Sequence, residues 1–565
     1  MSNIFKKRGQ KIAKTSRRHI EKNLISRFSH VQNIRLLILE WGLLILAITT
    51  LAIAQSLWYK KSYSSSFFTS GGTYTEATLG KVNSLNPLLA STNSEKAIAK
   101  LLYLGLTAPD YSGHTGNVLA KSISMSQNGK TWTVKLREGL KWSDGEPLTN
   151  EDVIYTVNLI KKATVTTSYS ANLSGVTLSE LKTGELVFNL SAAFVDFDSA
   201  LNFPILPKHI FEGKENFSDF TFDKTAAYSG PFMFKASQLS DDVSGSIFYL
   251  TANPNYYSKS PLLTNFIVHT FSTTDEIVAA LNSGLVTGTA ELLPTDSKQI
   301  TSLNVYEKDT SINSGVYLFL NTTSSIFSNK SLRKALQVGI NVDELRSIAG
   351  QKTPINFPIL PNQFEIKNWP TLPAYDLEKA KSVVASANLD EDVHLDLATI
   401  STGYFPALAE DLAEQLEDLG FKVDVSVYEP SRDFLINVIS SRAYDILLYE
   451  VSLGAEPDLF AYYHSSQKTS SGLNLSNYSN PIADNAIISA RETADQSARA
   501  GKYEAFLKYW VEDVPAIGLY QSDIAYYFNK NSRNFSEDNS LVAPIDRFID
   551  VNDWSVEKTT LNRTP

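Results

Sequence analysis

The sequence predicts an α/β protein of several compact parts, preceded by one membrane-spanning helix. Two observations predict this class: strand-like alternating segments recur between segments of helical periodicity, and one long apolar run lies near the N-terminus. At 565 residues, with 43% hydrophobic and 20% charged residues, the composition is that of a globular protein. This length implies about three or four compact units.

The first 35 residues form a basic segment that is expected to lie in the cytoplasm. They contain ten Lys or Arg residues and one acidic residue, Glu21, which gives a net charge of +9. Because the whole chain has a net charge of −9, residues 36–565 carry about −18. An acidic body of this kind opposes binding to nucleic acid.

Residues 36–57, LLILEWGLLILAITTLAIAQSL, form the apolar run. A helix of this length extends roughly 33 Å, enough to cross a bilayer. The preceding basic residues place the N-terminus in the cytoplasm and the remainder outside. A cleaved signal peptide is the alternative, with Ala52-Ile53-Ala54 as its cleavage candidate, but the long basic segment favours an uncleaved anchor. The chain has no cysteine, so a lipid-modified cysteine cannot be the tether.

Residues 58–71 are Ser-rich and lack a sustained period, which predicts a linker before folded sequence begins near Gly72. Thr131–Leu136, TWTVKL, alternates as a strand does. The clearest helix is Phe405–Leu419, which has leucines on one face and is ended by Gly420.

A second helix is expected at Tyr375–Ala387, with Asp376 as its N-cap. Each of these two helices is followed by a strand-like segment, Val393–Leu397 after one and Val423–Val427 after the other. Strands that alternate with covering helices imply a partly parallel sheet.

Residues 128–160 carry the most specific pattern in the chain, NGKTWTVKLREGLKWSDGEPLTNEDVIYTVNLI. They predict a strand, turns at Gly139 and Asp144-Gly145, and a helix capped by Thr149 or Asn150. The segment closely resembles the signature region of the family 5 bacterial extracellular solute-binding proteins, the receptors of oligopeptide and dipeptide importers. Other segments resemble this family in the same order: NSLNPLLA (83–90), YSGPFMF (228–234), NPNYY (253–257), SLRKALQVGINVDEL (331–345), YDLEKAKSVV (375–384), LNLSNYSNPIAD (473–484) and VPAIGLY (514–520).

The resemblance runs from Gly72 to about Phe535 and implies a two-lobed periplasmic-binding-protein type II fold, cluster C, with an extra first-lobe subdomain. The implied parts are lobe I at 72–311 with the subdomain at about 111–190, lobe II at 312–520, and a return to lobe I at 521–565. The chain would cross between lobes near Ser311 and Gln521. Hinge closure would then bury a ligand in the cleft. The N-terminal anchor departs from the family's usual secreted or lipid-tethered form.

The resemblance implies a non-enzymatic substrate-binding component of an ABC importer, which takes peptide-like solutes to a permease. A monomer without cofactor is expected, held at the cell membrane by its N-terminal helix with the binding domain outside. Two alternatives stay open: a ligand-binding sensor of the same fold, and a receptor for a non-peptide solute such as a sugar or a metal complex.

Peptide-binding members of the family hold an extended ligand largely through its backbone, so few side chains identify the site. By position, Ser91, Thr92 and Asn93 resemble a first-lobe strand that contacts ligand. Tyr169 resembles an aromatic residue that reaches into the cleft. A surface loop is the alternative for both segments.

Residues 445–460, DILLYEVSLGAEPDLF, resemble the strand and loop where the family meets a ligand's charged N-terminus. Peptide receptors typically place an Asp three residues before the acidic residue of the Asp/Glu-Pro pair, and this chain has Leu453 there. Ligand-binding candidates are Tyr449, Glu450, Glu456 and Asp458. For Glu456 and Asp458, capping of a helix that begins near Pro457 is the alternative.

Motifs of other classes fail on order or spacing. Ser331-Leu-Arg-Lys334 and Lys182-Thr-Gly184 fit parts of penicillin-binding enzymes, but the Lys-Thr-Gly segment comes before the serine rather than after it. The seven histidines are scattered without an H-E-x-x-H pattern, so no metal site is expected.

Overall fold

The computed structural model describes residues 14–15, 35–162, 169–173, 175–214, 220–239, 245–293, 296–351, 353–389, 394–429, 432–470, 472–536 and 540–562. Apart from residues 14, 15 and 35, the predicted basic cytoplasmic segment lies outside this part. The chain divides into two compact units, residues 1–68 with 558–565, and residues 69–557. Each unit is described by itself.

The first unit contains the predicted apolar helix. Helix α3 spans Arg35–Tyr63, and its segment Leu39–Trp58 is long and apolar enough to cross a membrane. Within the predicted linker at residues 58–71, α3 continues to Tyr63 and strand β1 (Ser64–Thr69) pairs with β18 (Glu557–Asn562). Regular structure persists because no Gly or Pro interrupts residues 43–70.

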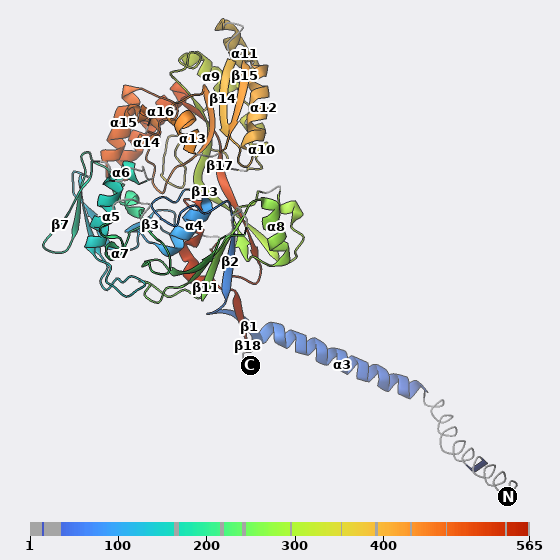
Figure 1. Ribbon diagram of the computed structural model, residues 1–565. Helices are drawn as coiled ribbons and strands as arrows, with labels where there is room; N and C mark the ends of the chain where they lie inside the picture. The colour runs from blue at the N-terminus through green and yellow to red at the C-terminus, as the bar shows by residue number, and fades with distance from the viewer. Residues whose placement is uncertain are drawn as a thin grey trace. The chain divides into compact units, whose positions relative to one another are not determined.

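The second unit has the predicted α/β architecture, built on one ten-stranded mixed sheet that runs through both lobes (Figure 1). Its strands, in spatial order, are β15 (Lys422–Tyr428), β14 (His394–Ile400), β16 (Ile446–Ser452), β13 (Val305–Leu320), β17 (Ala516–Asn529), β12 (Gly288–Thr289), β2 (Thr73–Leu79), β11 (Asn265–Phe271), β10 (Ile247–Ala252) and β9 (Phe232–Gln238).

The long antiparallel strands β13 and β17 join the lobes. Their first and last parts pair in lobe I at Val305↔Asn529 and in lobe II at Phe319↔Ala516, with one register shift between Ser311 and Gly315 and a second between Val316 and Tyr317. The predicted crossing residue Ser311 lies beside the first shift, and so does the second crossing residue, Gln521, which pairs with Gly315.

Strand direction brings the carboxyl ends of both half-sheets toward each other. Strands β2, β11 and β12 are mutually parallel, and they run in the direction of β13, from lobe I toward lobe II. Strands β14, β15 and β16 are parallel to one another and antiparallel to β13, so they run toward lobe I. The loops after these strands therefore meet between the lobes.

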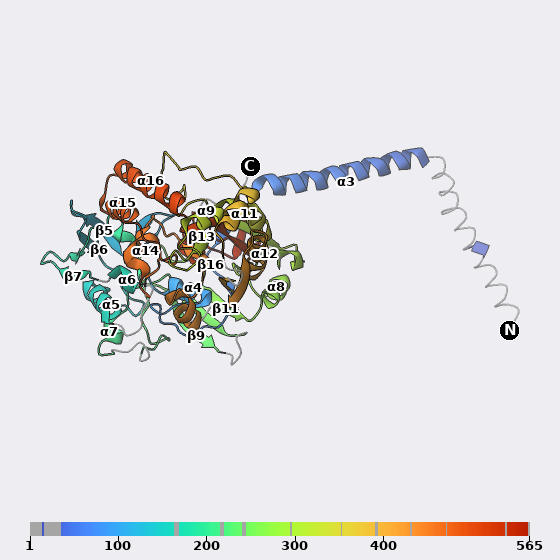
Figure 2. The ribbon, with the colours of Figure 1, turned by 90° about the horizontal axis from the view of Figure 1, so that it is seen from above.

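Helices cover both faces of the lobe II half-sheet. One face carries Leu318 and Leu448 and packs against α9 (Lys330–Gly339), α11 (Leu377–Ser386) and α12 (Phe405–Asp418). The other carries Phe319 and Leu447 and packs against α14 (Phe460–Tyr463), α15 (Pro481–Glu492) and α16 (Gln496–Asp513). Figure 2 shows these two helix groups on opposite sides of β16.

Several elements of lobe II were predicted correctly. Helix α11 has Asp376 as its N-cap, α12 is followed by β15, and β14 follows α11. The hydrogen bond from Lys379 N to Asp376 Oδ1, at 3.0 Å, satisfies one of the free amides at the start of α11. These elements follow from local periodicity and capping.

Lobe I carries a smaller four-stranded antiparallel sheet in the order β5-β6-β8-β7. Its strand β6 spans Thr131–Leu136, as predicted, and helix α5 (Asn150–Lys162) has Glu151 and Asp152 in its first turn. The other elements of the second unit are α4 (Asn93–Leu102), β3 (Thr107–Pro109), β4 (Thr115–Asn117), β5 (Ala120–Met125), α6 (Ser170–Leu173), β7 (Thr177–Glu180), β8 (Leu186–Asn189), η2 (Phe197–Asn202), α7 (Lys208–Phe211), α8 (Thr274–Ser283), η4 (Asp296–Gln299), α10 (Val342–Ile348), α13 (Arg432–Phe434), η5 (Leu435–Ser440), η6 (Ser465–Lys468) and η7 (Pro544–Asp553).

Candidate functional site

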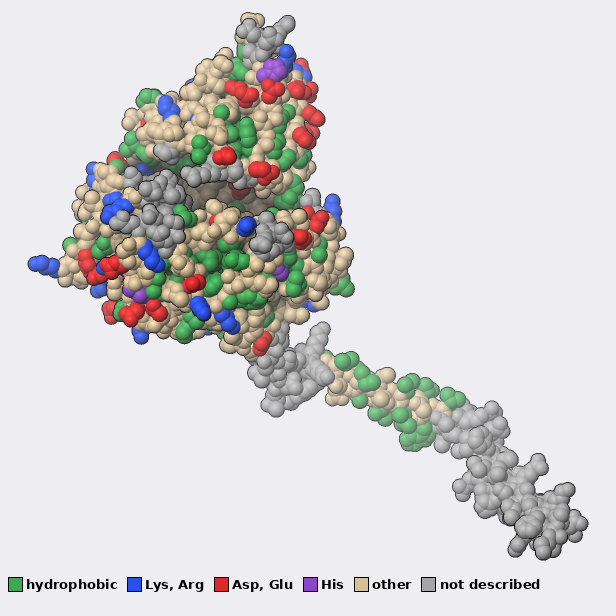
Figure 3. Space-filling model, viewed as in Figure 1, with side chains coloured by type: hydrophobic (Ala, Val, Ile, Leu, Met, Phe, Trp, Pro, Cys, Tyr) green, Lys and Arg blue, Asp and Glu red, His purple; other side chains and the backbone are tan. Residues whose placement is uncertain are grey.

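The candidate site is the interlobe cleft, which we define by the loops that follow β2 and β12 in lobe I and β14 and β16 in lobe II. The molecular surface is hollowed between the lobes (Figure 3). The loops of the two lobes come close to each other. A Cβ atom added to Gly403 of lobe II would lie 3.8 Å from Leu293 Cδ2 of lobe I. In α/β sheets, ligands bind beyond the carboxyl ends of the strands.

Glu450 lies near the carboxyl end of β16, opposite Val316 of the crossing strand β13. Its half-buried side chain lies beside Tyr520. Burial raises the pKa of Glu450, and hydrogen bonds with the side chains of Ser522 and Ser314 offset part of this rise. Within the described part of the chain, no Lys, Arg or His pairs with this carboxylate.

Tyr449 points to the opposite face of β16 because side chains alternate along a strand. Its ring lies 5.9 Å from that of Phe434, and it packs against the lobe II core. Burial raises the pKa of the Tyr449 hydroxyl, and the neighbouring Glu450 carboxylate raises it further.

Glu291 is a second carboxylate of the cleft, and it was not identified from the sequence. It follows β12, and its Oε2 accepts a hydrogen bond from Asn93 Nδ2 at 3.1 Å. Burial raises the pKa of Glu291, and the Asn93 hydrogen bond lowers it in part. The structure thus brings the predicted residue Asn93 to the end of the lobe I half-sheet.

Ser91 and Thr92 are held by Glu95 at the start of α4. Glu95 Oε2 accepts bonds from Ser91 N at 2.8 Å, Ser91 Oγ at 3.0 Å and Thr92 N at 3.2 Å, while Thr92 Oγ1 accepts from Glu95 N. This is a capping box. It fixes the loop at the edge of the cleft, and a ligand contact by these two residues stays a prediction.

Tyr169 packs partly buried against the lobe I core, with its ring 6.5 Å from that of Phe203. Its predicted reach into the cleft stays a prediction.

Glu456 and Asp458 each have a basic side chain as partner, and Asp458 also binds the first residue of a helix. Helix α14 begins at Phe460, not near Pro457, and Asp458 Oδ1 accepts a bond from Phe460 N at 3.2 Å. Asp458 Oδ2 also lies 3.1 Å from Arg491 Nη2, and Glu456 Oε1 lies 3.1 Å from His114 Nδ1.

Burial raises the pKa values of both carboxyl groups. For Glu456, Asp196 raises it further, and the hydrogen bond with His114 lowers it in part. For Asp458, Arg491 opposes the effect of burial.

Leu453 is buried, and the backbone around it is attached to the crossing strand β13. Leu453 N donates to Asn313 O at 2.8 Å, and Asn313 Nδ2 donates to Gly454 O at 2.9 Å. Gln363 Nε2 donates to the carbonyls of Leu453 and Gly454, both at 2.9 Å. Asn313 and Gln363 were not identified from the sequence, because both lie far from this loop along the chain.

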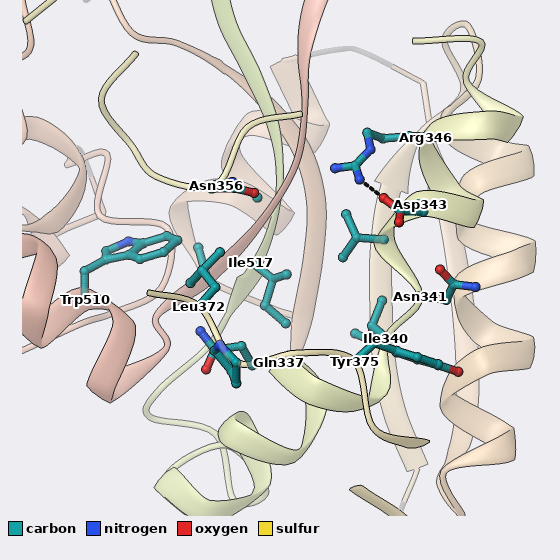
Figure 4. Close-up of a pocket in the computed structure, with 14 residues that line it drawn as sticks. Gln337, Ile340, Asn341, Asp343, Arg346, Asn356, Leu372, Tyr375, Trp510 and Ile517 are labelled. Atoms are coloured by element: carbon teal, nitrogen blue, oxygen red, sulfur yellow. Dashed lines mark ion pairs between the residues drawn. The ribbon is translucent and has the colours of Figure 1, made fainter. Parts of the chain in front are cut away.

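A pocket of about 180 Å³ lies wholly in lobe II, between α9, α10, the segment 356–375 and β17 (Figure 4). Arg346 on its wall pairs with Asp343 and donates from Nη1 to Leu519 O at 3.1 Å. None of its lining residues comes from the loops after β14 or β16. This pocket is therefore separate from the interlobe cleft.

A buried ionic network lies beneath the lobe I side of the cleft. Arg547 donates from Nε at 3.0 Å and from Nη2 at 2.8 Å to Glu76 Oε1, and the Tyr526 hydroxyl donates to Glu76 Oε2 at 2.6 Å. Glu76 is fully buried and Arg547 is nearly so. The network ties β2 to η7 and β17, and it fits a structural role.

Among the described residues, no group of three or more His, Asp or Glu side chains is arranged to hold a metal ion. The two half-buried carboxylates described above, Glu450 and Glu291, are suited to hydrogen bonding and to holding a positively charged group.

A family model, described as "Bacterial extracellular solute-binding proteins, family 5 Middle", matches residues 115–472. The oligopeptide-binding protein AppA of Bacillus subtilis is 27% identical over 482 residues, which cover 80% of this chain and 86% of AppA. The probable D,D-dipeptide-binding periplasmic protein DdpA of Escherichia coli is 22% identical, over 80% of this chain and 89% of DdpA.

Solved structures share the fold. That of Bacillus subtilis AppA in complex with a nonapeptide has a TM-score of 0.73 at 23% identity, and the match covers 87% of this chain and all of AppA. Helicobacter pylori DppA in complex with the peptide STSA gives 0.74 at 19% identity, over 86% and 99% of the two chains. Campylobacter jejuni NikZ in complex with Ni(L-His) gives 0.71 at 20% identity, over 86% and 99%.

Proposed function

Because the chain belongs to family 5 of the bacterial extracellular solute-binding proteins, we propose that it is the substrate-binding component of an ABC importer for peptides or peptide-like solutes. The cleft between the lobes takes the solute, and a permease in the membrane receives it. The protein binds its solute without covalent chemistry and acts as a monomer without cofactor.

The observation that carries this proposal is the cleft itself, at the facing carboxyl ends of two half-sheets joined by β13 and β17. The nature of the solute rests on the relatives. AppA is named an oligopeptide-binding protein, and its similarity spans four fifths of this chain. Backbone recognition of an extended peptide needs few specific side chains.

Glu450 is the proposed anchor for a positive charge on the solute. The position where peptide receptors of this family usually carry an Asp is taken by the buried Leu453. Glu450 lies on the adjoining strand with a desolvated carboxylate, which is costly to keep ionised unless a cation approaches it. A ligand ammonium or guanidinium between the lobes would supply that cation, with Tyr449, Glu456 and Asp458 nearby in sequence as further candidate contacts.

Helix α3 is the proposed anchor to the cell membrane, with the binding unit on the outer side. Its segment Leu39–Trp58 meets the length and composition of a membrane span. The excess of basic residues before it places the preceding segment in the cytoplasm. A tether of this kind keeps the receptor near its permease and raises its effective concentration there.

Native mass spectrometry of the full chain, purified in mild detergent without refolding, tests the proposal. The expected result is a set of co-purifying peptides that is lost on unfolding. A single sugar or a metal chelate as the carried solute would contradict peptide binding and favour the non-peptide alternative.

Deletion of the permease separates import from sensing. Loss of uptake of the identified solute is the expected result. Deletion of the receptor itself is the second strain. If that strain still takes up the solute but no longer changes its gene expression in response to it, the protein is a sensor.

A further inference from the structure

The lobes touch at a second place besides the crossing strands. Asp196 of lobe I lies in the segment between β8 and η2, and Arg499 of lobe II lies in the first turns of α16. Arg499 Nη1 donates to Asp196 Oδ1 at 2.7 Å and to Oδ2 at 2.6 Å. The Asp196 side chain is 13% exposed and the Arg499 side chain 7%, so this ion pair is almost fully removed from water.

A second arginine of lobe II reaches lobe I beside this pair. The Arg491 guanidinium lies 4.0 Å from the ring centre of Phe194 in lobe I and 4.5 Å from that of Phe460 in lobe II. Its backbone carbonyl accepts a hydrogen bond from Val195 N at 3.0 Å. One residue therefore makes a cation–π contact and a main-chain hydrogen bond across the lobe boundary.

A third contact involves the loop after β16. His114 Nδ1 of lobe I lies 3.1 Å from Glu456 Oε1 of lobe II. Asp458, two residues on, holds Arg491 from within lobe II. Tyr503 of α16 donates to Pro457 O at 2.7 Å and so fixes the same loop.

These contacts lie close together, since Asp196, Arg499 and His114 all act on the Glu456 carboxyl group. Removing one partner of a buried arginine–carboxylate pair leaves an unpaired charge away from water. The pair therefore favours a closed arrangement, in which the two charges neutralise each other, over an open one, in which each must be hydrated again.

We propose that Asp196–Arg499, Glu456–His114 and the Arg491–Phe194 contact form an interlobe latch that holds the empty protein closed along this edge. The latch shifts the equilibrium between open and closed lobes before any solute arrives. Since apparent affinity scales with the fraction of receptor in the binding-competent state, Asp196 and Arg499 act as positioning residues for whatever the cleft binds. The inference concerns the empty protein and does not depend on the identity of the solute.

The experiment compares the full chain with Asp196→Ala and Arg499→Ala, each freed of carried solute by unfolding and refolding. Small-angle X-ray scattering is expected to give a larger radius of gyration for both variants than for the native chain. Hydrogen exchange at the Val195 amide is expected to become at least about ten-fold faster in both, because its acceptor lies on the other lobe.

The charge swap Asp196→Arg with Arg499→Asp is the rescue control, and it is expected to restore part of the compact scattering curve. Lys502→Ala, on the exposed side of the same helix, is the matched surface control and is expected to change neither readout. Amides of β8 within lobe I report on the integrity of that lobe and are expected to exchange as in the native chain.

Unchanged scattering and unchanged Val195 exchange in both single variants would overturn the latch, whatever the protein binds. Faster exchange at Val195 and β8 together would also overturn it, since that pattern reports loss of lobe I structure. Failure of the proposed import function would leave these readouts of the empty protein unaffected, so the two ideas are tested separately.

Discussion

Glu450 carries the strongest expectation at the scale of single residues. Its carboxylate is desolvated at the end of β16, and no ion pair among the described residues involves it. The nearby hydroxyl groups of Ser314 and Ser522 stabilise it only in part. A cationic solute is the partner that this environment lacks.

Glu450→Gln is expected to weaken binding of a lysine-containing peptide by about 10- to 100-fold, since a hydrogen bond to a charged group contributes about 1.5–3 kcal/mol. Isothermal calorimetry would compare this peptide with the same peptide carrying norleucine in place of lysine. Equal losses for both peptides would show that Glu450 does not recognise charge. Glu414→Gln on the exposed face of α12 is the matched control.

Asp198 gives a pH-dependent expectation. Burial, together with the neighbouring Asp196 carboxylate, raises its pKa from an ordinary value of 3.8 to about 6. The folded state therefore binds this proton more tightly than the unfolded state, and the stabilisation present below pH 3.8 is lost as the pH rises through about 6.

Asp198→Asn should stabilise the protein at pH 8 by on the order of 1 kcal/mol and should flatten the decline of stability between about pH 4 and pH 6. Urea unfolding at a series of pH values measures both effects. Asp418→Asn, on the exposed surface of α12, is the control. A variant no more stable than the native chain at pH 8 would refute the argument.

The residues that were identified from the sequence and those that were missed differ in the reach of their interactions. Asp376 was predicted because a cap and its helix are adjacent in the chain. The partner of Glu456 lies 342 residues away, and Asp196 and Arg499 are separated by 303 residues. No local pattern relates such pairs, so their contacts depend on tertiary structure alone.

At the scale of elements, the packing of η7 onto the lobe I half-sheet depends on Arg547. This arginine and Glu76 are buried together, and the Tyr526 hydroxyl completes the coordination of the carboxylate. Loss of one partner leaves an unpaired charge in the interior, which is among the more destabilising single changes known.

Arg547→Ala is expected to lower the free energy of unfolding by about 3–5 kcal/mol. The control is Lys100→Ala, which removes the partly exposed ion pair between α4 and Asp546 of the same η7, and about 1 kcal/mol or less is expected there. Denaturant unfolding measures both. Similar losses for the two variants would mean that burial does not set the strength of the Glu76–Arg547 pair.

The helices and strands were predicted best where the spacing of apolar residues and the residues that end an element, such as glycine, indicate the same bounds. Helix α12 ends close to Gly420, and β6 matches its predicted bounds. Residues 58–71, predicted as a linker, include strand β1, since serine composition alone does not exclude a strand once a pairing partner, here β18, is present. The amino-acid composition of a segment indicates whether it is exposed to solvent, but it does not show whether the backbone pairs with another strand.

At the scale of the whole molecule, the two units differ in how much apolar surface they bury. The buried apolar clusters all lie between Tyr74 and Trp554, inside the second unit. In the first unit, the described residues 39–58 of α3 are exposed. The second unit is therefore expected to fold without the helix.

Removal of residues 1–63 should yield a protein that stays in the soluble fraction and keeps the melting temperature and carried solute of the full chain. Cell fractionation, calorimetry and native mass spectrometry measure these three properties. Loss of the solute on truncation would show that the N-terminal residues contribute to binding. A truncated chain that still sediments with membranes would refute α3 as the anchor.

Because pairing between β13 and β17 is interrupted at residues 312–314, this very short stretch is where the joint between the lobes bends most easily. Residues 312–314 turn from β17 toward another strand-like segment, where Ile312 pairs with Leu541 and Asn313 N lies 3.2 Å from the carbonyls of Leu541 and Val542. A continuous ladder would distribute bending along its whole length and resist it everywhere. Here the two half-sheets can rotate relative to each other as rigid bodies, and the backbone dihedral angles of residues 312–314 determine how easily they do so.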